Sequence, residues 1–303
     1  MSNDPSEMDD YSMERVRVLR GPEVVRQRPA MYIGTTSSKG IYYMVQQVLD
    51  RALEEVMAGY CTEIKVIIHK DQSITVVDNA RGILLDKHPI HKRSIIETLI
   101  EDIFDRTVTT HNPYEMSGGM HGFGLGIVCV LSTSFLVQVK QDRKIYQQEY
   151  RRGEKVSELI VLGKCDRDET GTAITFLPDE TIFDSIKLDR EIIKDRLREL
   201  AFLNKGIKFS LRDERLEEAG EVEYYNTRGV VAFVEYLSEE HLSVHKPLYF
   251  QHKRDSLVIE IAMNYTTDYD NKLYGFVNNI NTQEGQGGGT HIEGLNHGLK
   301  QAI

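Results

Sequence analysis

The segment VQQVLDRALEE holds the first side chains along the chain that could do chemistry. Its apolar residues recur at intervals of three, four and seven, which predicts a helix that buries one stripe. Gln47, Arg51 and Glu55 then share the polar face, one turn apart. A glutamine does not take up a proton at neutral pH, so Gln47 does not supply a base, and an arginine is always protonated, so Arg51 does not supply a metal ligand. The alternative is an ordinary surface pair at i, i+4, with Arg51 also reaching Glu55.

A second candidate is the segment VVDNARGI, in which Asp78 ends an apolar strand and a short turn with Gly82 follows. A carboxylate at a strand end can lie at the edge of a pocket and accept a hydrogen bond from an exocyclic amine. The alternative for Asp78 is simple turn chemistry, which favours aspartate on its own account. In the segment ETGTAITF, Thr172 opens another strand, and its alternative is an ordinary β-turn followed by a β-branched residue.

A glycine-rich stretch, SGGMHGFGLG, stands directly before an apolar helix. Glycines let a backbone approach a ligand closely, and the free N–H groups at a helix start attract anions, so a phosphate is the natural ligand. The stretch is not a P-loop, because no Gly-Lys-Ser/Thr follows, and its glycine order differs from that of the dinucleotide fingerprint. A glycine hinge beside a packed helix explains it equally well.

The composition limits the class of protein to which these candidate residues belong. The 303 residues suit two domains, and 40% hydrophobic with 28% charged residues describes a folded globular chain. The net charge of −10 does not favour nucleic acid. Local DNA contact could come from Arg26 to Arg28 or Lys87 to Arg93, although plain surface charge fits each better. No secretory signal, membrane span or His/Cys metal cluster is found, so we expect a cytoplasmic protein without a membrane partner or its own metal cluster.

The elements that must position these residues follow from the pattern. A hairpin of two strands is predicted over residues 63–79, a helix over 94–104 and a long polar loop after it. Four further strands over residues 135–178 are expected to form an antiparallel meander, followed by an amphipathic helix over 188–203. A charged connector over 212–229 then precedes a second set, with a helix expected over 230–238 and strands over 257–265 and 273–280.

The order of these motifs resembles the GHKL ATP-binding fold. More narrowly, it resembles the N-terminal half of the ATPase subunit of type IIA DNA topoisomerases, the gyrase B and topoisomerase IV ParE family. RPAMYIG is close to that family's R-P-G-M-Y-I-G, LRELAFLNKGIKFSLRD matches its long helix and next strand, and YGFVNNINTQEGQGGGTH matches its second domain. The resemblance implies an α+β protein: a flexible arm (1–14), a GHKL (Bergerat) two-layer α/β sandwich (15–220) and an incomplete ribosomal-S5-like transducer domain (221–303).

The resemblance also assigns roles in a site for ATP or ADP. It implies that Asp78 holds the adenine amine, that Thr172 supports it through water, and that Glu55 and Arg81 form a pair beside the base. The turn and lid residues implied to bind the nucleotide are Gly82, Ile83, Gly119, His121, Gly122 and Gly124. Tyr11 in the arm corresponds to a tyrosine that reaches across a dimer to the partner's nucleotide.

The catalytic half of the family pattern is changed. Gln47 stands where the family has the glutamate that activates water, and Arg51 stands where it has the asparagine that binds Mg²⁺. Ala80 and Glu115 replace a glycine and a lid lysine. A lost base typically costs about 10²–10⁴-fold in rate. These changes predict a nucleotide-binding clamp that is a pseudo-ATPase, with Mg²⁺ binding in doubt; the alternative is a competent ATP-dependent DNA topoisomerase subunit, in which another group rescues hydrolysis.

The partners implied by the resemblance are a second copy of the chain, joined through the arm, and a gyrase A or ParC-like subunit and DNA, joined through regions beyond this chain. A histidine kinase or chaperone of the same superfamily would share the nucleotide site. It would lack RPAMYIG and the G-G-T-H segment, so this third interpretation is disfavoured.

Overall fold

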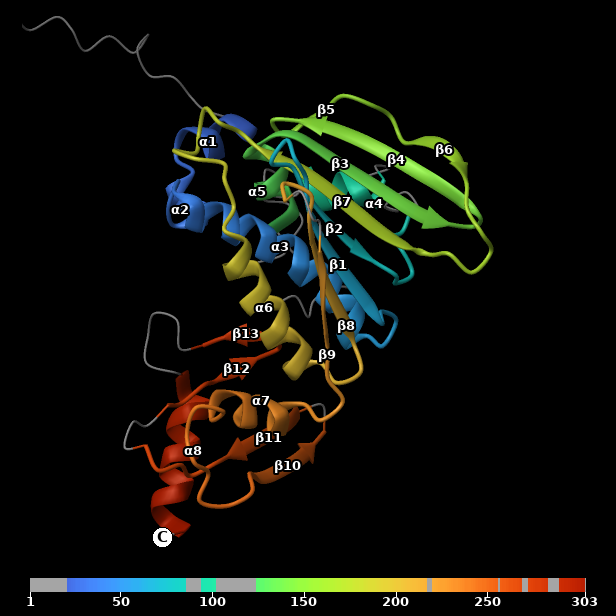
Figure 1. Cartoon of the computed structure of the whole chain (residues 1–303). Helices are drawn as coiled ribbons and strands as arrows, with labels where there is room; N and C mark the ends of the chain where they lie inside the picture. Colours follow the sequence, from blue (N-terminus) through green and yellow to red (C-terminus); the bar gives the residue numbers. More distant parts are fainter. Residues whose placement is uncertain are drawn as a thin grey trace, which may run out of the picture.

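The structure, a computed structural model, describes residues 21–85, 94–101, 124–216, 220–255, 257–268, 272–282 and 289–302. A mixed sheet with helices packed on one face forms the larger part, and a smaller group of helices and hairpins lies below it (Figure 1). The described helices are α1 Pro22–Gln27, α2 Ala30–Ile33, α3 Ser38–Met57, α4 Ile95–Glu101, α5 Gly124–Val130, α6 Arg190–Leu203, α7 Val230–Leu237 and α8 Gly289–Ala302. The described strands are β1 Glu63–Ile68, β2 Ile74–Asp78, β3 Ser132–Gln141, β4 Lys144–Arg151, β5 Glu154–Lys155, β6 Ile160–Lys164, β7 Gly171–Pro178, β8 Lys208–Asp213, β9 Glu221–Tyr225, β10 Leu248–Arg254, β11 Leu257–Met263, β12 Phe276–Val277 and β13 Ile280–Asn281.

The large sheet has the strand order β5-β4-β3-β7-β2-β1-β8-β9, with β6 paired to β4. The predicted hairpin of β1 and β2 is confirmed, and Ile68 pairs with Ile74 across its turn. The simple meander expected for residues 135–178 is wrong, because β7 does not pair with β6. It pairs with β3 on one side and β2 on the other, where alternate side chains of β7 are buried against the helices.

Strand β9 lies at the far edge of the same sheet, antiparallel to β8. The large sheet therefore continues to Tyr225, five residues beyond the boundary expected at residue 220. The division into domains remains a proposal, and this pairing favours a boundary between Tyr225 and Val230, where α7 begins.

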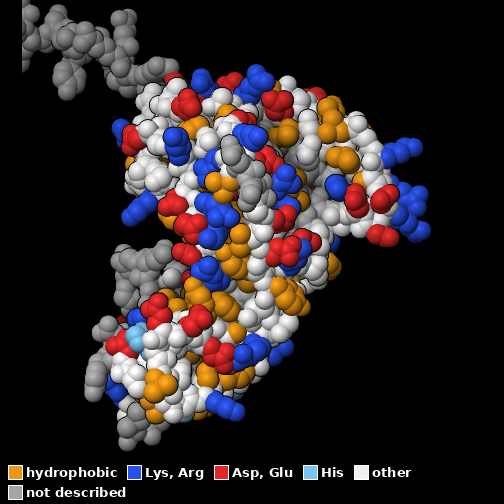
Figure 2. Space-filling view, in the orientation of Figure 1, with side chains coloured by type: hydrophobic (Ala, Val, Ile, Leu, Met, Phe, Trp, Pro, Cys, Tyr) orange, Lys and Arg blue, Asp and Glu red, His pale blue; other side chains and the backbone are white. Residues whose placement is uncertain are grey.

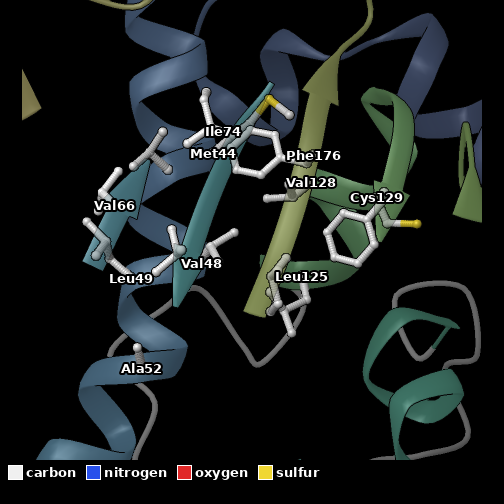
Figure 3. Close-up of a cluster of buried hydrophobic side chains, with 14 of the residues drawn as sticks. Met44, Val48, Leu49, Ala52, Val66, Ile74, Leu125, Val128, Cys129 and Phe176 are labelled. Carbon is white, nitrogen blue, oxygen red and sulfur yellow. The ribbon is translucent and has the colours of Figure 1, made fainter. Parts of the chain in front are cut away.

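The core of the larger domain lies between α3, α5 and the sheet. Met44, Val48 and Leu49 of α3 point toward the strands, and Phe176 of β7 and Val128 of α5 close the cluster (Figure 3). These five side chains are at most 2% exposed. Val48 and Leu49 belong to the apolar stripe predicted from the sequence, and its burial holds the opposite face of α3 in a fixed direction.

The smaller part carries more exposed apolar surface than the larger one. In the hairpin of β10 and β11, Phe250 and Leu257 are 54% and 58% exposed. The face drawn in Figure 2 shows acidic and basic side chains interspersed over the larger part, with apolar side chains gathered over the smaller one. The helix predicted over 230–238 and the strand predicted over 257–265 are confirmed as α7 and β11. The single strand predicted over 273–280 is wrong, because the chain turns at Asn278 and Asn279 and forms the hairpin of β12 and β13.

Asp179 joins the N-terminal helix to the end of β7. Its Oδ2 accepts a hydrogen bond from Arg26 Nη2 at 2.6 Å and lies 3.0 Å from Arg152 Nε. Its Oδ1 accepts from the hydroxyl and the backbone N–H of Thr181 at 2.7 and 3.0 Å. Burial alone would raise the pKa of Asp179, but Thr181 and Arg26 outweigh it and lower that pKa to about 2. Arg26 also donates to the carbonyl of Val130, so its charge serves an internal contact and not a DNA-binding patch.

Asp179→Asn is expected to lower the free energy of unfolding by about 2 kcal/mol at neutral pH. The folded-state pKa of about 2 lies below the ordinary 3.8, so the carboxylate stabilises the fold above the ordinary value. That stabilisation is lost as the pH falls from 3.8 through about 2. Urea unfolding at a series of pH values checks this, with the exposed Asp168→Asn as control. A gap from wild type that stays constant as the pH falls through this window would contradict the assignment.

Candidate functional site

The polar face of α3 is buried and is not a solvated surface. Gln47, Arg51 and Glu55 are 8%, 7% and 3% exposed. The interpretation of Gln47 and Arg51 as a harmless surface pair is therefore wrong. A buried charge is costly unless it is paired, so the partners of Arg51 and Glu55 decide what this face can bind.

Glu55 is the centre of a charged cluster. Its Oε2 accepts from Arg81 Nε at 2.9 Å and its Oε1 from Arg81 Nη2 at 3.1 Å, which is a bidentate pair. The same Oε1 lies 3.4 Å from Arg51 Nη1. The guanidinium carbon of Arg81 sits 3.7 Å from the ring centroid of Tyr60. The structure thus joins the predicted Glu55 and Arg81 pair and adds Arg51 to it.

Asp78 lies at the end of β2, directly opposite Thr172 of β7. Its Oδ1 accepts hydrogen bonds from the backbone N–H groups of Ala80 and Thr172 at 3.0 and 3.2 Å. The Thr172 hydroxyl in turn accepts from the N–H of Ile83 at 3.2 Å. These bonds lock the carboxyl group in one orientation, and the described contacts leave Oδ2 available to a ligand's N–H donor.

Two glycines allow the strand ends to meet at this point. Gly171 has φ +142°, and a Cβ there would overlap the carbonyl oxygen of Asp78. Gly82 has φ +83°, and a Cβ there would lie 2.8 Å from Val139 Cγ1. A side chain at either position would force the backbone apart, so both glycines are needed for the close approach around Asp78.

Gln47 meets the first residue of α5. A Cβ on Gly124 would overlap the side-chain oxygen of Gln47, so this glycine lets α3 and α5 pack closely. Of the glycine-rich segment, the structure describes Gly124 and the residues after it. The described part of the chain does not include the predicted site residues Tyr11, Gly119, His121 and Gly122. It does not include the altered position Glu115 either.

The electrostatics of the site are set by burial. Burial raises the pKa of Asp78, although the N–H groups of Ala80 and Thr172 and the charge of Arg51 act against it. Burial also raises the pKa of Glu54 to about 7, while Arg51 lowers it and the neighbouring carboxylates raise it. Arg51 therefore acts electrostatically on both carboxyl groups from the middle of the site.

Two residues that contribute contacts to the site were not predicted from the sequence. The guanidinium of Arg81 stacks on Tyr60, and the sequence signal was an aromatic residue just past the end of α3. Asn79 accepts from the N–H groups of Thr62 and Glu63 at 2.9 Å each, which ties the turn after β2 to the start of β1. An asparagine beside Asp78 gives no pattern that would reveal this contact.

Comparison with known proteins shows which families and relatives this chain is similar to. Residues 36–182 match the family described as histidine kinase-, DNA gyrase B- and HSP90-like ATPase, and residues 229–303 match the family described as DNA gyrase B. The chain is 39% identical to the DNA gyrase B protein of Halalkalibacterium halodurans and 37% identical to that of Haloferax volcanii, in each case over 98% of this chain.

The fold is similar to the 43K ATPase domain of Thermus thermophilus gyrase B, solved in complex with an aminocoumarin. The TM-score is 0.78 at 32% identity, covering 95% of this chain and 75% of that one. The chain belongs to the DNA gyrase B family. Its α+β fold, with a GHKL domain followed by a transducer region, is thereby confirmed.

Membership of the gyrase B family carries nucleotide binding with it, because the matched domain is an ATPase domain. The chain spans 46% of the length of the curated relatives named above. Within the described residues, no helix has the length and apolar character needed to cross a bilayer. The residue roles at the gyrase B site, and the activity of the full-length protein, are matters of proposal.

Proposed function

We propose that this chain is the nucleotide-operated clamp region of a gyrase B or ParE-like subunit, and that it binds ATP or ADP with little or no hydrolysis. Asp78 accepts the adenine amine, Thr172 supports it, and Glu55 with Arg81 lines the base. The proposal rests on one observation above the others, which is the buried guanidinium of Arg51 paired to Glu55 at 3.4 Å.

The side chain of Arg51 on α3 does not fit a magnesium ion. Mg²⁺ takes oxygen ligands in octahedral geometry, and a guanidinium has no lone pair to offer. Arg51 stands at the position of the family's asparagine ligand, and its fixed positive charge repels a cation. In this proposal, the positive charge that faces the bound nucleotide is therefore the guanidinium of Arg51 and not a metal ion.

The same helix lacks a base for water activation. Gln47 is one turn before Arg51 and lies against Gly124, and the resemblance puts it at the position of the family's glutamate, which would take a proton. Its amide can orient a water molecule by hydrogen bonding but does not accept a proton at neutral pH. Glu54 has a raised pKa, yet it lies two helical turns beyond Gln47 and beside Glu55.

The wider assembly is proposed from the family alone. It consists of a cytoplasmic homodimer joined by the N-terminal arm through Tyr11, with DNA and a gyrase A or ParC-like subunit contacting regions that this chain does not include. The net charge of −10 fits a chain whose DNA contacts are local or lie elsewhere. A competent ATP-driven topoisomerase subunit is the alternative function, favoured by the intact surroundings of Asp78.

Removing magnesium is expected to change the nucleotide affinity of this chain by less than about threefold. The physical reason is that Arg51 supplies a protein-borne charge where the family uses the metal. Isothermal titration calorimetry with ADP, in Mg²⁺ and in EDTA, measures the two dissociation constants. Arg51→Asn is the matched variant, because it restores the family's ligand and should make the affinity Mg²⁺-dependent by about tenfold or more.

Strict Mg²⁺ dependence of the unaltered chain would refute the role of Arg51. Asp78→Asn serves as the control for site identity, since it removes the charged acceptor of the adenine amine and should weaken binding by about 10- to 100-fold under both conditions. Tight binding by Asp78→Asn would place the nucleotide elsewhere.

A further inference from the structure

Helix α3 ends in a tight turn that brings Tyr60 back beside Glu55. The N–H of Tyr60 donates to the carbonyl oxygen of Glu55 at 2.9 Å, and the N–H of Gly59 donates to that of Val56 at 2.9 Å. These are the two hydrogen bonds of a Schellman motif, in which the residue after the helix cap is left-handed. Gly59 fills this position with φ +80°. The backbone of the helix end therefore fixes the position of Tyr60.

Tyr60 places its aromatic ring against the cation of Arg81. The residue is 53% exposed, so its ring contributes little to the hydrophobic core. The guanidinium carbon of Arg81 lies 3.7 Å from the ring centroid, well within the distance of about 6 Å at which a cation is attracted to the face of a ring. A half-exposed ring gains little from burial, so this contact accounts for its place in the fold better than packing does.

Arg81 is held from two directions. Its Nε and Nη2 atoms donate to the two carboxylate oxygens of Glu55, which fixes one edge of the guanidinium. The ring of Tyr60 supports the same group at its central carbon. The Arg81 side chain is 49% exposed, so a ligand can reach it, and its long stem would otherwise adopt several rotamers. Two contacts from different directions leave the guanidinium less freedom than the carboxylate alone.

Both supports of Arg81 belong to one rigid helix end. The side chain of Glu55 is fixed by burial, and the backbone N–H of Tyr60 is bonded to the carbonyl oxygen of the same residue. Glu55, Tyr60 and Arg81 therefore form a closed ring of contacts in which the two supports keep their spacing. Immobilising a long side chain costs affinity when a ligand binds, so a side chain that is already held binds its ligand more tightly.

We propose that Tyr60 is a positioning residue, which holds the guanidinium of Arg81 in the orientation that lines the base and so raises the affinity for nucleotide. The inference rests on the proposed function, because it takes the base to lie beside Glu55 and Arg81. Tyr60 acts through Arg81 and makes no contact of its own with the nucleotide. A cation–π contact between half-exposed groups corresponds to a change of about two- to fivefold in the dissociation constant.

The hold of Tyr60 on Arg81 is tested first without nucleotide. Nitrogen NMR spectra of the labelled chain show the Nε–H of Arg81, which Arg81→Gln removes and so identifies. Tyr60→Leu should speed the exchange of this proton with water by about two- to fivefold, because the bond to Glu55 loses one support. Tyr60→Phe keeps the ring and should preserve the slow exchange. Tyr225→Leu, at a 62% exposed position on β9, is the matched control. Equal exchange in wild type and Tyr60→Leu would overturn the proposal.

The part played by the helix end is tested at Gly59, again through the Nε–H of Arg81. A left-handed position accepts asparagine more readily than a β-branched residue. Gly59→Val should therefore speed the exchange, and Gly59→Asn should change it less. Gly206 is the matched control, because it follows α6 with φ +81° and, like Gly59, has no atom within 4 Å of an added Cβ. Gly206→Val should leave the exchange unchanged. Equal effects of valine at the two glycines would show a general loss of stability and would overturn the proposed route from the helix end to Arg81.

Calorimetry with ADP then measures what the contact does for binding. Tyr60→Leu should weaken binding by about two- to fivefold, and Tyr60→Phe should leave it unchanged. In the Arg81→Gln background, Tyr60→Leu should have no further effect. Full binding by Tyr60→Leu, or the same weakening with and without Arg81, would refute the positioning role. Absent binding to wild type would instead refute the proposed nucleotide site, while the exchange of the Arg81 Nε–H still decides whether Tyr60 holds Arg81.

Discussion

Changing Gln47→Glu together with Arg51→Asn is expected to raise the rate of ATP hydrolysis by about 10²–10⁴-fold. Glutamate at 47 supplies a base against the start of α5, and asparagine at 51 removes the repelling charge and offers an amide oxygen to Mg²⁺. Steady-state phosphate release with Mg²⁺ measures the gain. The assay uses a protein of the relatives' full length, since this chain spans 46% of that length.

The single changes separate the two causes. Gln47→Glu alone should gain little, because the base would still face a site that repels the metal, and Arg51→Asn alone should restore metal binding without turnover. Gln46→Glu is the matched control, since it makes the same chemical change one residue away, where the side chain hydrogen bonds to Tyr42. A wild-type rate equal to that of competent relatives, or no gain in the double variant, would contradict the pseudo-ATPase proposal.

Motif order, through the resemblance that it carries, was enough to predict from sequence that Asp78 and Thr172 lie together. Asp78 and Thr172 are 94 residues apart, yet each is tied to a strand end, and β2 and β7 pair with these two residues opposite one another. The contact of Arg51 with Glu55 was expected only as part of a surface pair, and its burial could not be predicted in the same way. A long flexible side chain can reach a full turn either way along a helix, and the buried carboxylate of Glu55 decides the outcome.

Strand order shows a second limit of the same kind. Local turns predicted which residues form β3, β4, β6 and β7, because hairpin signals are short-range. The place of β7 between β3 and β2 depends on pairing over long separations, which the alternating pattern of one strand does not encode. Strand β10 was missed because its second half, QHKR, is polar and exposed on both faces.

Glu55→Gln is expected to lower the free energy of unfolding by about 3 kcal/mol or more, which is large for a change of one atom. The substitution keeps the volume of the side chain but removes the negative charge that Arg51 and Arg81 share. Arg51 is buried, so the loss of the Glu55 carboxylate removes part of the compensation of its charge where water cannot replace it. Urea unfolding near neutral pH measures the loss. Glu169→Gln is the control, because its pair with Lys140 is about half exposed and should contribute less than about 1 kcal/mol.

A second substitution shows whether Arg51 or Arg81 causes that loss of stability. If the loss arises because the charge of Arg51 is poorly compensated without Glu55, then Glu55→Gln with Arg51→Met should recover at least half of the lost stability. A neutral side chain of similar length needs no counter-charge. Arg81 is 49% exposed, and water can solvate it after Glu55 is neutralised. No recovery would mean that the bidentate contact between Glu55 and Arg81 carries the stability, and that Arg51 has support elsewhere. A full recovery would show that Arg51 lowers the free energy of unfolding. That result is expected of a residue whose role, as proposed, is to bind a ligand.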